Sequence, residues 1–265
     1  MTETTRYSEK LTLDVDGAVA SVRLTNPDRH NAFDDGLIAD ITKAFEAVSD
    51  MDIVRAVILR ADGKSFSAGA DLNWMKRVAG YTFEENVADA GLLARMLQVI
   101  DTCPKPVVGR IQGAAFGGGV GLVSCCDIAI GTPRAGFSLS EVKLGLIPSA
   151  ISPYVVKAIG ARAARRYFLT AEKFDAAEAY RLGLLHDVVA EDALDQAVDA
   201  IVDAILAAGP NAVREAKDLI FAVDRPITQD IIDDTAHRIS RVRATDEGQE
   251  GIASFLEKRK ASWTH

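Results

Sequence analysis

The sequence has little cysteine and no long apolar run, and both shortages limit what it can be. Its 265 residues include three cysteines, none of them in a C-x-x-C pair, so we expect neither a disulfide framework nor a cysteine zinc site. Four histidines are scattered without an H-E-x-x-H cluster. No stretch approaches the roughly 18 apolar residues of a membrane helix, and the N-terminal residues lack a signal-peptide core. We therefore expect a cytoplasmic protein with reduced thiols, no metal and no membrane contact.

The chain also has fewer positively charged than negatively charged residues. The chain has 30 lysines and arginines against 38 aspartates and glutamates, which gives a net charge of −8 and a pI of about 5.1. This balance disfavours nonspecific nucleic-acid binding, so no nucleic-acid partner is expected. An apolar fraction of 48% is typical of a soluble globular protein. A chain of this length forms one large domain, or one domain with an appendage.

Glycine, by contrast, is concentrated in one loop. Residues 113–121 read GAAFGGGVG and follow an apolar, β-branched run. A loop of this kind at the start of a helix points free N–H groups at an anion, or at an oxygen that becomes one. It fits neither phosphate motif, because Leu122 stands at the last glycine of G-x-G-x-x-G and Gly119 stands where a P-loop has its lysine. The loop is therefore either a tight packing turn or a site for a developing negative charge.

Apolar periodicity predicts an α/β core. Alternation around an Asp-Gly turn predicts a hairpin over residues 11–24, and apolar residues at helical spacing predict a helix from Asp34 to Val48. A buried strand, a small-residue loop and a helix follow over residues 56–74 and again over 107–124. Further helices are expected over residues 82–102, 162–169 and 176–182, and further strands over 127–130, 136–139 and 185–189.

The pattern becomes wholly helical near Glu191. Helices are expected over residues 193–208, 211–222, 227–243 and 247–260. Amphipathic helices without strands cannot bury their apolar faces alone, so they need the core or a neighbouring subunit. We therefore divide the chain into a core over residues 1–191 and a helical region over residues 192–265.

Two loops and one carboxylate are candidates for chemistry. The loop from Phe66 to Leu72 is also rich in small residues and leads into a helix. If amides from both loops reached one oxygen they would form an oxyanion hole, in which one lost donor costs about 2.7 to 4 kcal/mol. Glu141 follows a short apolar strand, so it is either a general acid or base with a raised pKa or a helix-capping or surface residue. Asp71 is expected to be the N-cap of the helix at Leu72.

Together these stretches resemble the crotonase superfamily, also called the enoyl-CoA hydratase/isomerase family. The resemblance covers nearly the whole chain and rests on SAGADL at 67–72, the 113–121 loop, CDI at 126–128, EVKLGLIP at 141–148 and FLEKR at 255–259. It implies a spiral α/β core of repeated strand-strand-helix units and a C-terminal helical trimerisation region. It also implies a homotrimer or a dimer of trimers.

The resemblance assigns roles to individual residues. The amides of Ala70 and Gly118 would hold the thioester oxygen of an acyl-CoA, and Glu141 would be the general acid and base. The residues implied to hold CoA are Arg29, Ala32, Ala68, Asp71 and Leu72, with Phe255 and Lys258 reaching it from the tail or from an adjacent subunit. Coenzyme A is then part of the substrate, and no separate cofactor is expected.

Two positions depart from the family pattern. Hydratases of the two-glutamate type carry one glutamate two residues after the triple glycine and a second about twenty residues later. This chain has Gly121 at the first position and keeps only Glu141. The lost contact to water would remove a few kcal/mol of barrier lowering. The run SAISP at 149–153 replaces a glycine-rich run of many relatives, which predicts a remodelled acyl pocket.

Three functions remain open on this basis. Residues 113–167 are similar to bacterial hydratases of 3-methylglutaconyl-CoA and isohexenylglutaconyl-CoA, which favours hydration of a branched or carboxylated 2-enoyl-CoA. A Δ3,Δ2-enoyl-CoA isomerase would use Glu141 alone to move a proton. The third reading is a CoA-thioester or RNA-binding relative without catalysis, which the negative net charge and Glu141 disfavour. The sequence identifies no basic partner for a second carboxylate, since Lys76, Arg77 and Lys143 are near only along the chain.

Overall fold

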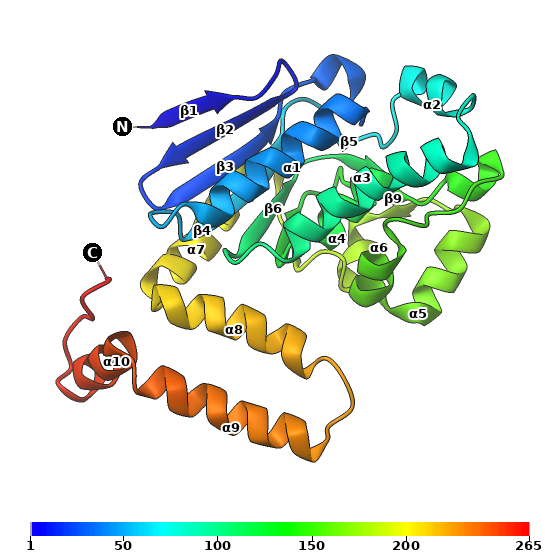
Figure 1. The fold of residues 1–265 in the computed structure, drawn as a ribbon. Coiled ribbons are helices and arrows are strands. Elements are labelled where there is room, and N and C mark those ends of the chain that lie inside the picture. The colour runs from blue at the N-terminus through cyan, green and yellow to red at the C-terminus, as the bar shows by residue number, and fades with distance from the viewer. Residues whose placement is uncertain (1, 265) are drawn as a thin grey trace.

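Two β-sheets form the centre of the fold, which a computed structural model describes for residues 2–264 (Figure 1). The larger sheet has the strand order β1-β2-β3-β4-β6-β8-β11, and the smaller has the order β10-β9-β7-β5. The strands are β1 (Glu3–Arg6), β2 (Leu11–Asp16), β3 (Val19–Leu24), β4 (Ala56–Ala61), β5 (Ser65–Ser67), β6 (Val107–Ile111), β7 (Ala114–Phe116), β8 (Ile128–Gly131), β9 (Gly136–Ser138), β10 (Phe174–Asp175) and β11 (Asp187–Val188).

Helices cover these sheets and continue beyond them. The α-helices are α1 (Asp35–Asp50), α2 (Leu72–Val78), α3 (Phe83–Asp101), α4 (Gly118–Ser124), α5 (Ser152–Thr170), α6 (Ala176–Leu182), α7 (Leu194–Ala207), α8 (Pro210–Val223), α9 (Gln229–Arg243) and α10 (Asp246–Leu256). Three short 3-10 helices are η1 (Pro27–Arg29), η2 (Glu141–Leu144) and η3 (Glu191–Ala193). The expected hairpin is confirmed as the antiparallel pair β2–β3.

The repeated unit of the core is two strands followed by helical structure. β4, β6 and β8 lie side by side and parallel in the larger sheet, while β5, β7 and β9 lie side by side and parallel in the smaller one. Each repeat of this unit therefore adds one strand to each sheet, which confirms the expected spiral α/β fold. Because β5, β7 and β9 are parallel, the loops that follow them leave from the same edge of the sheet.

Helix α1 shows how the sequence pattern produces an element. The side chain of Asp34 accepts a hydrogen bond from the amide of Leu37 at 2.9 Å and so caps the helix. Apolar side chains at helical spacing, including Ile41 and Phe45, are fully buried beneath it. The predicted N-cap of α2 is also confirmed, since the Asp71 side chain accepts from the amides of Asn73 and Trp74 at 2.8 and 3.1 Å.

Some elements differ from the sequence prediction. Helix α5 begins at Ser152 and not at residue 162, and Gly160 interrupts it with φ 74° and ψ 151°. The positive φ of Gly160 interrupts the helical spacing of the apolar residues. The sequence therefore predicts only the part of α5 that follows Gly160. The short strands β1, β5, β7 and β10 were not predicted, because two to four residues carry little alternation.

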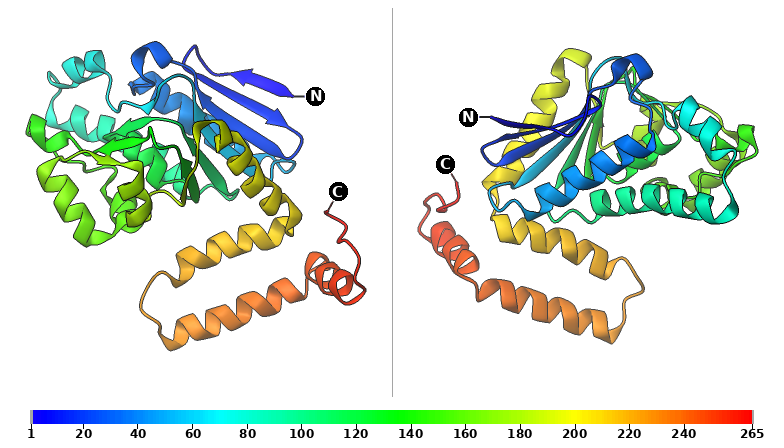
Figure 2. Two further views of the ribbon diagram at one scale, coloured as in Figure 1. Left: turned by 180° about the vertical axis from the view of Figure 1, so that it is seen from behind. Right: turned by 45° about the horizontal axis from the view of Figure 1, so that its top comes forward.

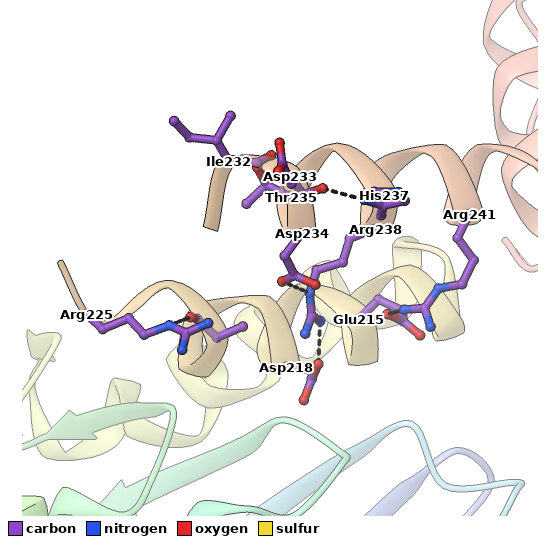
Figure 3. A network of polar contacts seen from close by, with 11 residues as sticks. Glu215, Asp218, Arg225, Ile232, Asp233, Asp234, Thr235, His237, Arg238 and Arg241 are labelled. Carbon is purple, nitrogen blue, oxygen red and sulfur yellow. Dashed lines mark hydrogen bonds and ion pairs between the residues drawn. The ribbon is translucent and has the colours of Figure 1, made fainter. Parts of the chain in front are cut away.

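The predicted C-terminal helices are present, but they pack in two different ways. Helix α7 lies on the larger sheet, where Val198 packs against Val108 and their buried neighbours. The arm of α8, α9 and α10 instead extends away from the sheets (Figures 1 and 2). Ion pairs tie α8 to α9 through Arg238, which contacts Asp218, and through Arg241, which contacts Glu215 (Figure 3). Arg238 also pairs with Asp234 within α9. The division of the chain at residue 191 remains a prediction, and α7 belongs to the packing of the sheet.

A buried ion pair joins the arm to the core. Lys217 on α8 is 8% exposed, and its Nζ lies 2.6 Å from Oδ2 of Asp127. The same carboxylate oxygen accepts a hydrogen bond from the amide of Val107 at 2.7 Å. Asp127 thus fixes the start of β6 and the position of α8 at once.

We predict that Lys217→Ala lowers the free energy of unfolding by about 2 kcal/mol, because it leaves Asp127 partly buried without its cation. Chemical denaturation at fixed protein concentration measures the loss. Arg241→Ala is the control, because the Arg241 side chain is 62% exposed and its ion pair should contribute less than about 1 kcal/mol. Equal losses in the two variants would contradict a special role for the buried pair.

Candidate active site

The loops after β5, β7 and β9 meet around one cavity of about 340 Å³. Its lining includes Ala70 after β5, Gly118 after β7 and Glu141 after β9. These are the three residues that the sequence analysis assigns to catalysis, and the parallel strands bring them together. Ala68 also lines the cavity.

The first two loops are in direct contact through glycine. Gly69 has φ +82°, and a Cβ on it would lie 2.7 Å from the carbonyl oxygen of Phe116 and 3.6 Å from the amide nitrogen of Gly118. A side chain here would push the loops apart. The backbone of Phe33 also holds the first loop, donating to Gly69 O at 2.6 Å and accepting from the amide of Asp71 at 2.7 Å.

Among the described residues, the backbone amides of Ala70 and Gly118 remain without a hydrogen-bond acceptor in this arrangement. Neither donates a hydrogen bond to a backbone acceptor among residues 2–264. Gly118 is the first residue of α4, where an amide has no partner within the helix. Two free N–H donors therefore border one cavity, which is a setting for an oxygen that gains negative charge.

Glu141 supplies the acidic group of the cavity. Its Oε1 lies close to Gly117, where a Cβ would approach it to 3.1 Å, and its Oε2 is buried without a hydrogen-bond partner. Burial raises the pKa of the Glu141 carboxyl above its ordinary value, and a hydrogen bond from its own backbone opposes this only in part. Of the two alternatives that the sequence left open for Glu141, the raised pKa agrees with its burial, and such a carboxyl is suited to take up and release protons.

Comparison with known proteins shows which family has this sequence and fold. A profile described as enoyl-CoA hydratase/isomerase matches residues 14–265. A crystal structure of an enoyl-CoA hydratase from Shewanella pealeana is 47% identical and covers 96% of each chain with a TM-score of 0.93. The crotonyl-CoA hydratase of Syntrophomonas wolfei is 32% identical over 96% of this chain and 98% of its own. This chain belongs to the enoyl-CoA hydratase/isomerase family.

The departure from the two-glutamate pattern of the family has a packing explanation. A Cβ on Gly121 would overlap Cγ2 of Ile151 and lie 3.0 Å from its Cβ and 3.3 Å from Cδ2 of Leu97. Ile151 is 2% exposed and lines the cavity. It occupies the space that a side chain at position 121 requires. Ile151 belongs to the run at 149–153, whose difference from relatives remains a prediction, and its contact with Gly121 has no signal in the sequence.

The residues that the resemblance assigns to CoA are more dispersed. Arg29 ends η1 and Ala32 is nearly buried, both ahead of the Phe33 contact. Leu72 is 73% exposed at the start of α2. Phe255 is 82% exposed at the end of α10, and Lys258 follows it with φ 54°. Both belong to the arm, and within residues 2–264 neither lines this cavity.

The cavity wall also contains a polar pair that sequence reasoning missed. Trp74 on α2 donates from Nε1 to Oδ1 of Asp89 on α3 at 3.1 Å, and both residues line the cavity. No lysine, arginine or histidine is among the lining residues within the described chain. Arg77, one of the nearby basic residues, pairs with Asp35 instead.

Residues 2–264 contain no group of three or more histidine, cysteine, aspartate or glutamate side chains arranged to hold a metal ion. The same residues contain no helix with the length and apolarity needed to cross a membrane.

The unpartnered carboxyl of Glu141 predicts a pH-dependent stability difference. Its pKa is raised on folding, so its contribution to stability is fully present below the unfolded pKa of about 4.3 and is lost as pH rises through the folded pKa. Glu141→Gln should therefore match the wild type near pH 4 and be more stable by about 1 kcal/mol at pH 8. Denaturation curves at both pH values test this. A variant less stable than the wild type at pH 8 would contradict it.

The overlap of positions 121 and 151 predicts strong coupling between them. Gly121→Ala should cost about 1 to 2 kcal/mol by overpacking, and Ile151→Ala about 2 to 4 kcal/mol by leaving a cavity. The double variant should lose at least about 1 kcal/mol less than the sum, because the new methyl group enters the vacated space. A double-mutant cycle of unfolding free energies measures this coupling.

Gly91 provides the matched control for that cycle. It lies in α3, and a Cβ on it would meet nothing within 4 Å. Gly91→Ala should stabilise the protein by about 0.5 to 1 kcal/mol, since alanine is the better helix former. Additive losses at positions 121 and 151 would refute the overlap.

Proposed function

We propose that the chain is an enoyl-CoA hydratase that adds water across the double bond of a 2-enoyl-CoA with a branched acyl group. The observation that carries the proposal is the buried, unpartnered carboxylate oxygen of Glu141 in the same cavity as the free amides of Ala70 and Gly118. A proton carrier and two donors around one space are the parts that addition to an unsaturated thioester requires.

In this mechanism the two amides hold the thioester oxygen. As the oxygen of water bonds to C3, the π electrons of the C2–C3 double bond move toward the thioester carbonyl, which becomes an enolate. The amides stabilise that charge. Glu141 takes the proton that the water loses and then delivers a proton to C2, which leaves a 3-hydroxyacyl thioester and restores the carboxylate.

The wall of the cavity supports a branched and largely apolar acyl group. Leu93, Ile147 and Ile151 line it together with the ring of Trp74. A substrate with a second carboxylate, such as 3-methylglutaconyl-CoA, finds no basic side chain in the cavity lining that residues 2–264 form. Its carboxylate would remain hydrated at the cavity mouth, where Ser149 is exposed. The neutral branched form is therefore the better match, and the carboxylated form is the comparison substrate.

The CoA portion and the assembly complete the proposal. Arg29, Ala32, Ala68, Asp71 and Leu72 lie on the loops before and beside the oxyanion donors and would bind CoA. Phe255 and Lys258 would contact it from the arm of a neighbouring subunit in a homotrimer or dimer of trimers. No cofactor is proposed, because CoA is part of the substrate.

The packing of Gly121 against Ile151 favours a second candidate function. A Δ3,Δ2-enoyl-CoA isomerase moves one proton between C2 and C4, which a single carboxylate can do without a positioned water. A binding protein without catalysis is the weaker alternative, because a buried carboxylate without a partner costs stability and serves nothing there.

Purified protein should hydrate 3-methylcrotonyl-CoA or 3-methylglutaconyl-CoA, and Glu141→Gln should lower kcat by about 10² to 10⁴. Loss of absorbance of the conjugated thioester measures the reaction, and crotonyl-CoA shows the effect of the branch. Glu172→Gln is the control, since Glu172 lies on the surface in an ion pair with Arg166. Conversion of a 3-enoyl-CoA with no hydration of any substrate would replace the hydratase by the isomerase.

A further inference from the structure

The cavity contains a second carboxylate that the resemblance to the family does not assign. Within residues 2–264, its acidic lining residues are Glu141 on η2 and Asp89 on α3. We infer that Asp89 holds the water that adds to C3, in place of the glutamate that position 121 cannot carry. This inference rests on the proposed hydratase function.

The first step of the argument is the exclusion of position 121. Ile151 fills the space beside Gly121, so the water has no acceptor from α4. Glu141 alone must then both receive the proton of the water and protonate C2. A single carboxylate can perform both transfers only if another group keeps the water oriented toward C3.

The second step is the fixed position of Asp89. Its Oδ1 accepts the indole N–H of Trp74 at 3.1 Å, and Trp74 is 7% exposed. The N-cap of α2 is Asp71, the residue after Ala70. The same short segment therefore carries one oxyanion donor and the side chain that orients Asp89. The helix that carries Asp89 is fixed as well, because a capping box between Thr82 and Glu85 forms at the start of α3.

The third step is the chemistry left to Asp89. One carboxylate oxygen is engaged by the indole, and Oδ2 has no hydrogen-bond partner among the described residues. Among residues 2–264 no cationic side chain lines the cavity, so the remaining oxygen takes its donors from water or from the ligand. A water that donates one hydrogen to Asp89 and the other to Glu141 keeps its lone pairs free for C3.

The reaction step balances without any further reactant. The oxygen of water bonds to C3 while the C2–C3 π bond breaks toward the thioester carbonyl. The proton on the Glu141 side passes to that carboxylate and a proton returns to C2. The hydrogen facing Asp89 stays on the new hydroxyl group, so Asp89 accepts a hydrogen bond and is not itself protonated.

Asp89→Asn tests this role, because the amide oxygen of asparagine still accepts from Trp74 while its NH₂ group cannot accept from water. We expect kcat for hydration to fall by about 10- to 100-fold, with KM for the same enoyl-CoA changed by less than about threefold. Exchange of the C2 protons of butyryl-CoA in D₂O needs the amides and Glu141 only, so it should keep its wild-type rate. Glu84→Gln, on the exposed first turn of the same helix, should change neither rate.

Each outcome of this experiment supports or overturns the role of Asp89. Hydration at the wild-type rate in Asp89→Asn, or an equal fall in hydration and exchange, overturns the inference. If that variant does not fold, Asp89→Glu takes its place. Asp89→Glu keeps the carboxylate but moves it by one methylene group. Slower hydration with an unchanged rate of C2 proton exchange in this variant supports the role of Asp89. A wild-type protein that exchanges C2 protons but hydrates no enoyl-CoA overturns the proposed function, and the role of Asp89 with it.

Discussion

Close approach between two backbones, at the ends of β5 and β7, is the constraint on which the site depends. Gly69 fits against the carbonyl of Phe116, and a Cβ on Gly119 would lie 2.5 Å from the carbonyl oxygen of Ser67. Only residues without a side chain allow the loops to touch. The contact brings the free amides to one cavity, while the parallel pairing of β7 and β9 brings Glu141 there. The spiral of strands is therefore what makes distant segments of the chain into one site.

The site carries costs that the rest of the molecule offsets. Glu141 is a buried carboxylate with an unpartnered oxygen, and Gly117 adopts φ +50° beside it. The unpartnered oxygen opposes folding and is left ready for a ligand, whereas the positive φ is one that glycine adopts without strain. The opposing stability comes from two clusters of buried apolar side chains, one of which includes α7 on the larger sheet. Rigid surroundings of this kind hold an acid and two donors in place without help from the ligand.

Much of this fold could be predicted from the sequence, because its signals are local. The Asp-Gly turn predicted β2 and β3, helical spacing predicted α1, and the small-residue loops after apolar runs predicted the repeated unit. The apolar neighbours of Glu141 allowed a raised pKa but left a capping or surface role open, and only its burial in the fold favours the raised pKa. What could not be predicted depends on packing between segments far apart in the chain. The meeting of Gly121 with Ile151 and the hydrogen bond from Trp74 to Asp89 leave no trace in spacing or composition.

The contact between Gly121 and Ile151 also limits how such a protein can change over generations. A larger residue at position 121 collides with the isoleucine, and a smaller one at position 151 opens a hole in the interior. Each single step toward a second acid on α4 is therefore harmful, although both steps together need not be. Two simultaneous substitutions are rare, so a lineage that acquires this pair tends to keep it. Steric interlocking would then preserve a one-glutamate enzyme long after any selection for it had ended.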